Sequence, residues 1–189
     1  MKSKNQIEDL YPLSPVQHGI LFHSLYEPES GVYLVQKYCT LSGDLNIAAF
    51  EQAWQRVVER HTILRTSFMW EGLDEPLQIV NRKVQLGLSQ LDWRDLTPAQ
   101  QQRRLEKYLE RERKQGFNLS EAPLMRLALI RLSADSYKFV WTYHHLIIDG
   151  WCYALLLGEV FNFYEAFSKQ RDVELKRTRP FRDYIAWLR

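Results

Sequence analysis

The sequence has few of the residues that mark disulfide-rich, metal-binding or membrane proteins. Only two cysteines, Cys39 and Cys152, occur among 189 residues, and they form neither a disulfide framework nor a metal-like pair. No apolar run approaches membrane-spanning length, and the segment that follows Met1 lacks an apolar signal region. We therefore expect a soluble protein of the reducing cytoplasm.

An excess of charge of one sign is also missing. Lys and Arg number 25 against 23 Asp and Glu, which leaves a formal net charge of +2. So small a charge gives no argument for a nucleic acid or an anionic membrane as partner. Hydrophobic residues make up 46% of the chain, enough for a packed core, and its length fits one domain or one lobe of a larger one.

Hydrophobic periodicity and capping residues predict five helices. Ser14 and Gln17 have the spacing of a capping box, and Pro15 fits the first helical position that follows. Asn46 and Thr97 stand where two further helices would start. The expected helices are Pro15–Leu25, Ile47–Arg60, Ala99–Lys114, Trp151–Phe167 and Phe181–Leu188.

Alternating apolar residues between these helices predict strands. The expected strands cover residues 33–41, the end of 60–68, 77–80, 84–91, 125–132 and 137–143, the last two as a hairpin. Strands and helices interleave without an internal repeat or a linker. The sequence therefore predicts an α/β fold (mixed α+β) in which helices cover a mixed sheet.

The most distinctive stretch is the loop that joins the last strand to a long helix. It reads His144-His145-Leu146-Ile147-Ile148-Asp149-Gly150. Adjacent side chains at the end of a strand point to opposite faces, so the two histidines cannot share one metal ion, and no further ligands stand at a metal-like spacing. Asp149 fits an N-cap, and Gly150 permits a tight turn. Two interpretations stay open: two buried histidines beside an ordinary cap, or one histidine that faces a cleft.

Four segments together resemble a known family. Leu13–Phe22, Arg60–Phe68, Tyr143–Cys152 and Phe181–Leu188 are similar, in this order, to the first four motifs of the condensation domains of nonribosomal peptide synthetases. The histidine loop matches the HHxxxDG motif of the wider superfamily, the chloramphenicol-acetyltransferase-like acyltransferases. Since the motifs span almost the whole chain, the resemblance covers the fold as well as the loop.

The resemblance implies a reaction and a role for each site residue. It implies amide bond formation between a donor peptidyl thioester and an acceptor amine, as in antibiotic biosynthesis. His145 matches the catalytic histidine, either as a base or as a group that positions the amine. His144 and Gly150 would support the loop, and Asp149 would form a structural ion pair with Arg65. Loss of one partner of such a buried pair would cost about 3–5 kcal/mol.

The resemblance also implies partners that lie outside this chain. A complete condensation domain is about twice this length, so residues 1–189 are expected to form its N-terminal lobe, inactive without the C-terminal lobe. Donor and acceptor peptidyl carrier domains would deliver the substrates on phosphopantetheine arms, beside an adenylation domain. We expect no bound cofactor and no metal ion. Residues 1–10 are expected to help dock an upstream synthetase.

The first motif also carries a resemblance to one subtype of the family, and three other functions stay open. Tyr11–Pro15 together with Gly19–His23 resembles the subtype that joins a D-residue donor to an L-residue acceptor. The rivals are an acyltransferase that uses free coenzyme A, an epimerisation domain, which shares the histidine motif, and a non-catalytic module that only binds carrier domains.

Overall fold

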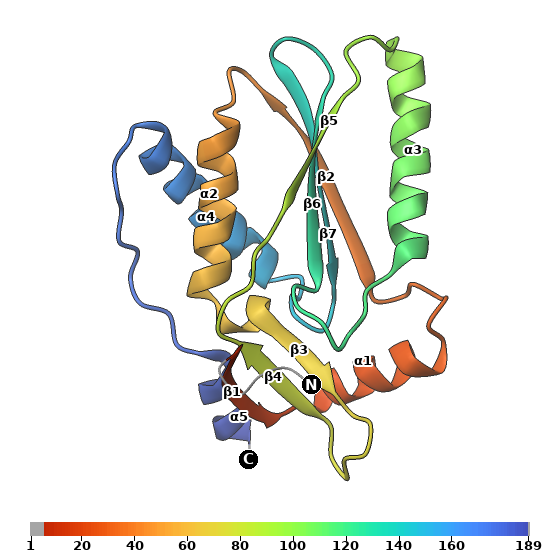
Figure 1. Ribbon diagram of the computed structural model, residues 1–189, viewed down its shortest axis with the longest axis vertical. Coiled ribbons are helices and arrows are strands. Elements are labelled where there is room, and N and C mark those ends of the chain that lie inside the picture. The colour runs from red at the N-terminus through yellow and green to blue at the C-terminus, as the bar shows by residue number, and fades with distance from the viewer. Residues whose placement is uncertain (1–5, 189) are drawn as a thin grey trace.

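The larger of two sheets forms the centre of the protein. The computed structural model describes residues 6–188. Its four-stranded sheet has the order β2 (Leu34–Ser42), β7 (Ser136–His144), β6 (Met125–Arg131) and β5 (Leu88–Asp92). β7 runs antiparallel to both β2 and β6, whereas β5 is parallel to β6. The sheet is therefore mixed, as predicted (Figure 1).

Side-chain alternation along β7 separates the two faces of this sheet. Phe139, Trp141 and Tyr143 lie in the main core, while Val140 belongs to a second apolar cluster on the opposite face. His144, an even-numbered residue like Val140, falls on that second face. The alternation thus decides on which side of the sheet the first histidine of the loop lies.

Helices cover both faces (Figure 1). On the main core side lie α2 (Ile47–Arg60) and α4 (Cys152–Ser168), and their buried side chains include Trp54 and Val160. On the other side α3 (Pro98–Gln115) packs Leu105 against the second cluster. Most of α3 is exposed, as its charged sequence predicts.

A three-stranded antiparallel sheet lies below the larger one (Figure 1). Its order is β1 (Ile7–Pro12), β4 (Leu77–Asn81) and β3 (Thr66–Met69), and a 3-10 turn, η2 (Thr62–Arg65), precedes β3. α5 (Phe181–Leu188) packs Ile185 and Phe181 against Tyr11 and Val80 of this sheet. α1 (Pro15–Tyr26) follows β1 directly.

Most predicted elements are confirmed, with shifts of one or two residues at their ends. The capping box of Ser14 and Gln17 is present, and Asn46 and Thr97 cap α2 and α3. β1 and the division into two sheets were not predicted, and the expected strand 84–91 begins only at Leu88. The apolar spacing of residues 151–167 also places Leu155 on the buried face of α4, and this is wrong, since Leu155 is 72% exposed.

The expected docking segment at residues 1–10 is only partly described by the structure. Of the expected docking segment, residues 1–5 lie outside the described residues, and residues 7–10 belong to β1. Docking therefore stays a prediction. Among the described residues, none of the helices combines the length and the apolar character needed to cross a membrane.

Candidate active site

The histidine loop is held from both sides by backbone and amide hydrogen bonds. The amide of His144 donates to Leu124 O at 3.0 Å, and the amide of His145 donates to Tyr33 O at 2.8 Å. From α1, the buried Gln17 donates through Nε2 to Leu146 O at 3.1 Å. These bonds fix the loop between the end of β7 and the start of α4.

His145 is half-buried and has one defined protonation site. Its Nδ1 lies 2.9 Å from Ile148 O. Because a carbonyl oxygen only accepts hydrogen bonds, Nδ1 carries the proton, and in the neutral ring Nε2 keeps its lone pair. The Tyr33 ring packs edge-on at 6.5 Å between ring centroids. Within residues 6–188 Nε2 has no hydrogen-bond partner, so the neutral ring offers this nitrogen as a proton acceptor.

His144 has the opposite character. It is 7% exposed, and both of its ring nitrogens have partners. Nδ1 accepts from the Leu146 amide at 3.2 Å, so the proton of the neutral ring lies on Nε2, which faces Ser24 Oγ at 3.4 Å. The Ser24 hydroxyl in turn donates to Ile20 O. This arrangement fits the expected supporting role, because neither nitrogen is left for chemistry.

Burial, assisted by the neighbouring His145, lowers the pKa of His144 from 6.5 to about 4. The unfolded chain therefore binds the proton more readily than the folded one, and folding is favoured most above pH 6.5. As the pH falls from about 6.5 towards 4, the protein should lose on the order of 3 kcal/mol of unfolding free energy from this group. Urea unfolding across this range would measure the loss, with His144→Gln as the control that lacks the titrating ring. Parallel curves for the two proteins would contradict the assignment.

Asp149 lies three residues before α4, whose N-cap residue is Trp151 and has no side-chain cap hydrogen bond. Its Oδ1 accepts from the amides of Trp151 at 3.0 Å and Cys152 at 2.8 Å. Partial burial opposes ionisation of Asp149, but the hydrogen bonds from Cys152 and Trp151 outweigh it and lower the pKa of the carboxyl. Asp149 therefore does not hold the N-cap position that the sequence predicts, but its carboxylate binds two amides at the start of α4.

The expected ion pair between Asp149 and Arg65 is wrong. Arg65, which is 5% exposed, donates from Nη1 to Glu8 Oε2 at 2.6 Å and to Asn81 O at 2.5 Å. The reason is topological: Arg65 ends η2 beside the three-stranded sheet, where β1 supplies Glu8 and β4 supplies Asn81. Asp149 instead turns to the amides of its own loop. Arg65 thus stabilises the smaller sheet and not the histidine loop.

Gly150 is exposed, and a Cβ added to it would meet nothing within 4 Å. No atom of the described residues therefore requires glycine here, and its expected role in supporting the loop stays a prediction.

Three residues near the loop were not predicted as members of the site. Gln17, read only as a capping residue, also pairs with the buried Gln78 and holds the loop. Tyr33 anchors His145, and Ser24 anchors His144. Only Gln17 had a usable signal, because it lies inside the first motif. The contacts of the other two depend on how α1 and β2 meet β7.

The described residues contain no group of three or more His, Cys, Asp or Glu side chains placed to hold a metal ion.

Arg60 and His61 share a single carboxylate, that of Glu159 on α4. Arg60 Nε lies 3.1 Å and His61 Nε2 lies 2.7 Å from Glu159 Oε2. This cluster ties α2 to α4, in agreement with a structural role for both residues.

The family model that matches is that of the condensation domain, over residues 7–189. The chain belongs to the condensation-domain family. Among its relatives, one of the linear gramicidin synthase proteins of Brevibacillus parabrevis is 49% identical over 97% of this chain and 4% of the relative. Surfactin synthase subunit 3 of Bacillus subtilis (strain 168) is 36% identical over 98% of this chain and 15% of the relative.

Solved condensation domains have the same fold. The starter condensation domain of rhizomide synthetase superposes with a TM-score of 0.84 at 23% identity, over 95% of this chain and 45% of that chain. The first condensation domain of the calcium-dependent antibiotic synthetase, in complex with a substrate analogue, gives 0.83 at 19% identity, over 96% and 45%. This chain therefore spans less than half of these condensation domains, and the mixed α/β architecture of the family is confirmed.

Proposed function

We propose that this condensation-domain chain is an N-terminal lobe that contributes His145 to amide bond formation in nonribosomal peptide synthesis. The observation that carries the proposal is the hydrogen bond from His145 Nδ1 to Ile148 O. It leaves Nε2 as a proton acceptor at a fixed place in the HHxxxDG loop. His144, Asp149 and Gln17 hold the loop in this position through hydrogen bonds to its backbone.

The reaction joins two thioester-bound substrates. The amine nitrogen of the acceptor attacks the thioester carbon of the donor, a C–N bond forms, and the C–S bond breaks. The proton that the nitrogen loses passes to His145 Nε2, and the leaving thiolate takes up a proton. A free α-amine titrates near 8, so part of it is already neutral at physiological pH, and the base is most useful after attack, when the adduct is acidic.

Proton transfer and positioning would contribute unequally. General base catalysis contributes on the order of 10²–10⁴-fold. Holding amine and thioester in reacting geometry contributes roughly 7–11 kcal/mol. Positioning therefore contributes more to the rate than proton transfer does. It requires protein contacts on both sides of the two substrates. Since this chain spans less than half of the solved domains, we propose that the lobe alone is inactive.

The partners follow from the same proposal. Donor and acceptor would arrive on the phosphopantetheine arms of two carrier domains, next to an adenylation domain. The similarity to multidomain synthetases supports this arrangement. We keep the D-donor and L-acceptor subtype as part of the proposal.

A condensation assay with loaded carrier domains tests the proposed function. It compares this chain with a two-lobe form in which a condensation C-terminal lobe follows residue 189. We expect peptide product only from the two-lobe form. Product from the short chain would contradict the need for two lobes. Racemisation without product, or acyl transfer from free coenzyme A, would replace the proposed function with one of its rivals.

A further inference from the structure

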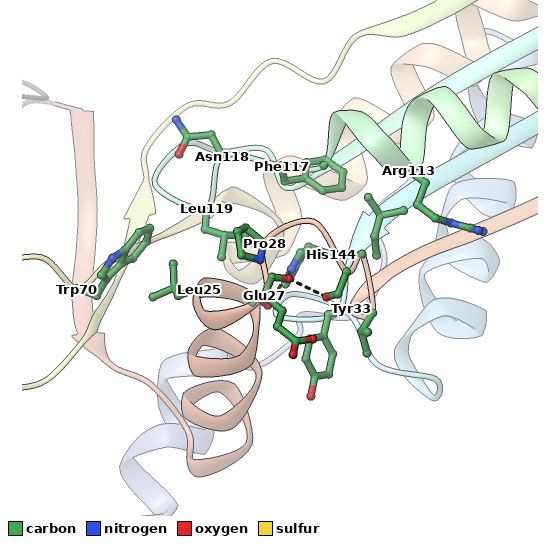
Figure 2. Close-up of a pocket in the computed structure, with 16 residues that line it drawn as sticks. Leu25, Glu27, Pro28, Tyr33, Trp70, Arg113, Phe117, Asn118, Leu119 and His144 are labelled. Atoms are coloured by element: carbon green, nitrogen blue, oxygen red, sulfur yellow. Dashed lines mark hydrogen bonds between the residues drawn. The ribbon is translucent and has the colours of Figure 1, made fainter.

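A pocket lies next to the histidine loop, on the side where His144 lies (Figure 2). It has a volume of about 250 Å³, and besides His144 and Arg113 its lining comes from three separate segments. These are the C-terminal end of α1 with the turn into β2, the loop of residues 116–119 after α3, and Trp70 at the end of β3. His144 lines it, whereas His145 does not.

The lining is mainly apolar and aromatic. It includes Leu25, Trp70, Phe117 and Leu119 (Figure 2). Val32 is 69% and Leu25 41% exposed at this site, so apolar surface that a ligand could cover is in contact with water. Burial of such surface yields roughly 25 cal/mol per Å².

The charged side chains of the lining, Glu27 and Arg113, are both exposed, whereas its buried members are Leu119 and His144. Both ring nitrogens of His144 are used by the Leu146 amide and Ser24. The exposed Arg113 already donates to Gln36 Oε1 at 3.1 Å. A charged group that reached this buried end would lose hydration without gaining a partner there, which costs several kcal/mol. The buried end of the pocket therefore favours an uncharged group.

Tyr33 links this pocket to the candidate catalytic residue. It lines the pocket, its carbonyl oxygen accepts from the His145 amide, and its ring packs against the His145 ring. The turn before it is held against α3, because a Cβ added to Gly31 would meet Arg113 Cγ at 3.3 Å. A ligand in the pocket would thus lie one side chain away from His145.

We infer that the pocket formed by Leu25, Tyr33, Trp70, Phe117, Leu119 and His144 receives the uncharged, apolar side chain of one of the two condensing aminoacyl groups. The inference rests on the proposed function, which it deepens by assigning a specificity-determining site. Both substrates carry such a side chain, so the chemistry is common to donor and acceptor, and the experiment must tell them apart.

Binding to this chain tests the inference without any need for catalysis. The probes are the N-acetylcysteamine conjugates of leucine and of glycine, with a stable amide in place of the thioester. In NMR titrations we expect the leucine probe to shift the Trp70 indole and Leu25 methyl signals saturably, and to bind about tenfold more tightly than the glycine probe. Leu25→Trp, which fills the pocket, should abolish this preference.

The matched control is Val16→Trp, on the same helix, 69% exposed and outside the pocket lining. It should leave the preference for the leucine probe unchanged. Equal binding of the two probes, shifts elsewhere in the chain, or an unaltered preference in Leu25→Trp would overturn the inference.

Condensation rates in the two-lobe form then separate the two sources of the side chain. Leu25→Trp should lower the rate about tenfold or more with leucine on one carrier, while glycine on that carrier changes the rate less than about twofold. If the contrast appears with the donor carrier, the pocket binds the donor side chain. If it appears with the acceptor carrier, the pocket binds the acceptor side chain. An equal loss for leucine and glycine on both carriers would contradict the inference. A two-lobe form that makes no peptide from any substrate would instead refute the proposed function.

Discussion

Replacing His145 with alanine in the two-lobe form should lower the rate of peptide formation by about 10²–10⁴-fold. The substitution removes the unprotonated Nε2 that the Nδ1 bond to Ile148 O holds in place. It should leave the unfolding free energy almost unchanged, because the ring is half-buried and the backbone bond from the His145 amide to Tyr33 O remains. Single-turnover assays with loaded carriers would measure the rate.

Two further measurements make this prediction specific. His18→Ala removes another partly exposed histidine and should retain full activity, because the His18 ring contacts Glu75 at 3.9 Å and no residue of the histidine loop. Added imidazole distinguishes the two roles of His145, because rescue of the alanine variant indicates proton transfer and its failure indicates positioning. A rate within about threefold of the unaltered protein would remove His145 from the mechanism.

The second large effect concerns stability and the ion pair of Arg65. Glu8→Ala leaves the guanidinium buried without its carboxylate, a situation that costs up to about 3–5 kcal/mol. The Glu8 side chain is 36% exposed, so solvent screens part of the pair, and we expect a loss of about 2–4 kcal/mol. Asp149→Ala removes only the carboxylate that accepts from the Trp151 and Cys152 amides and should cost about 1 kcal/mol.

Urea unfolding at pH 7 compares these variants directly. Glu71→Ala, in an exposed turn, is the control and should change stability by less than about 0.5 kcal/mol. The order of effects is the test. An equal loss of stability in Asp149→Ala and Glu8→Ala would contradict this order. It would support the ion pair between Arg65 and Asp149 that the sequence resemblance implies.

The sequence predicted the local structure well because local rules govern it. Caps at Ser14, Asn46 and Thr97 and the period of the apolar residues define the helices. β1 was missed because IEDLYP has little apolar alternation, and its pairing with β4 depends on contacts about 70 residues apart in the chain. Such pairings are set by the whole fold and not by the segment itself.

The same distinction applies to the site. The strand-to-loop transition correctly placed His144 and His145 in different surroundings, since alternation along β7 is a local property. The partner of Arg65 was predicted wrongly because an ion pair depends on which distant carboxylate the topology brings near. Glu8, in a strand that had not been predicted, was therefore not considered. Tyr33 and Ser24 were missed for the same reason.

The protonation state of the two loop histidines is the most direct test of the central claim, which is that His145 offers Nε2 while His144 only supports the loop. Two-bond ¹H–¹⁵N correlation spectra of this chain at pH 7.5, with His144→Gln used for assignment, would report it. We predict that the neutral ring of His145 carries its proton on Nδ1 and that the ring of His144 carries its proton on Nε2. A proton on Nε2 of His145 would contradict the account, because the nitrogen proposed to accept the amine proton would already be occupied.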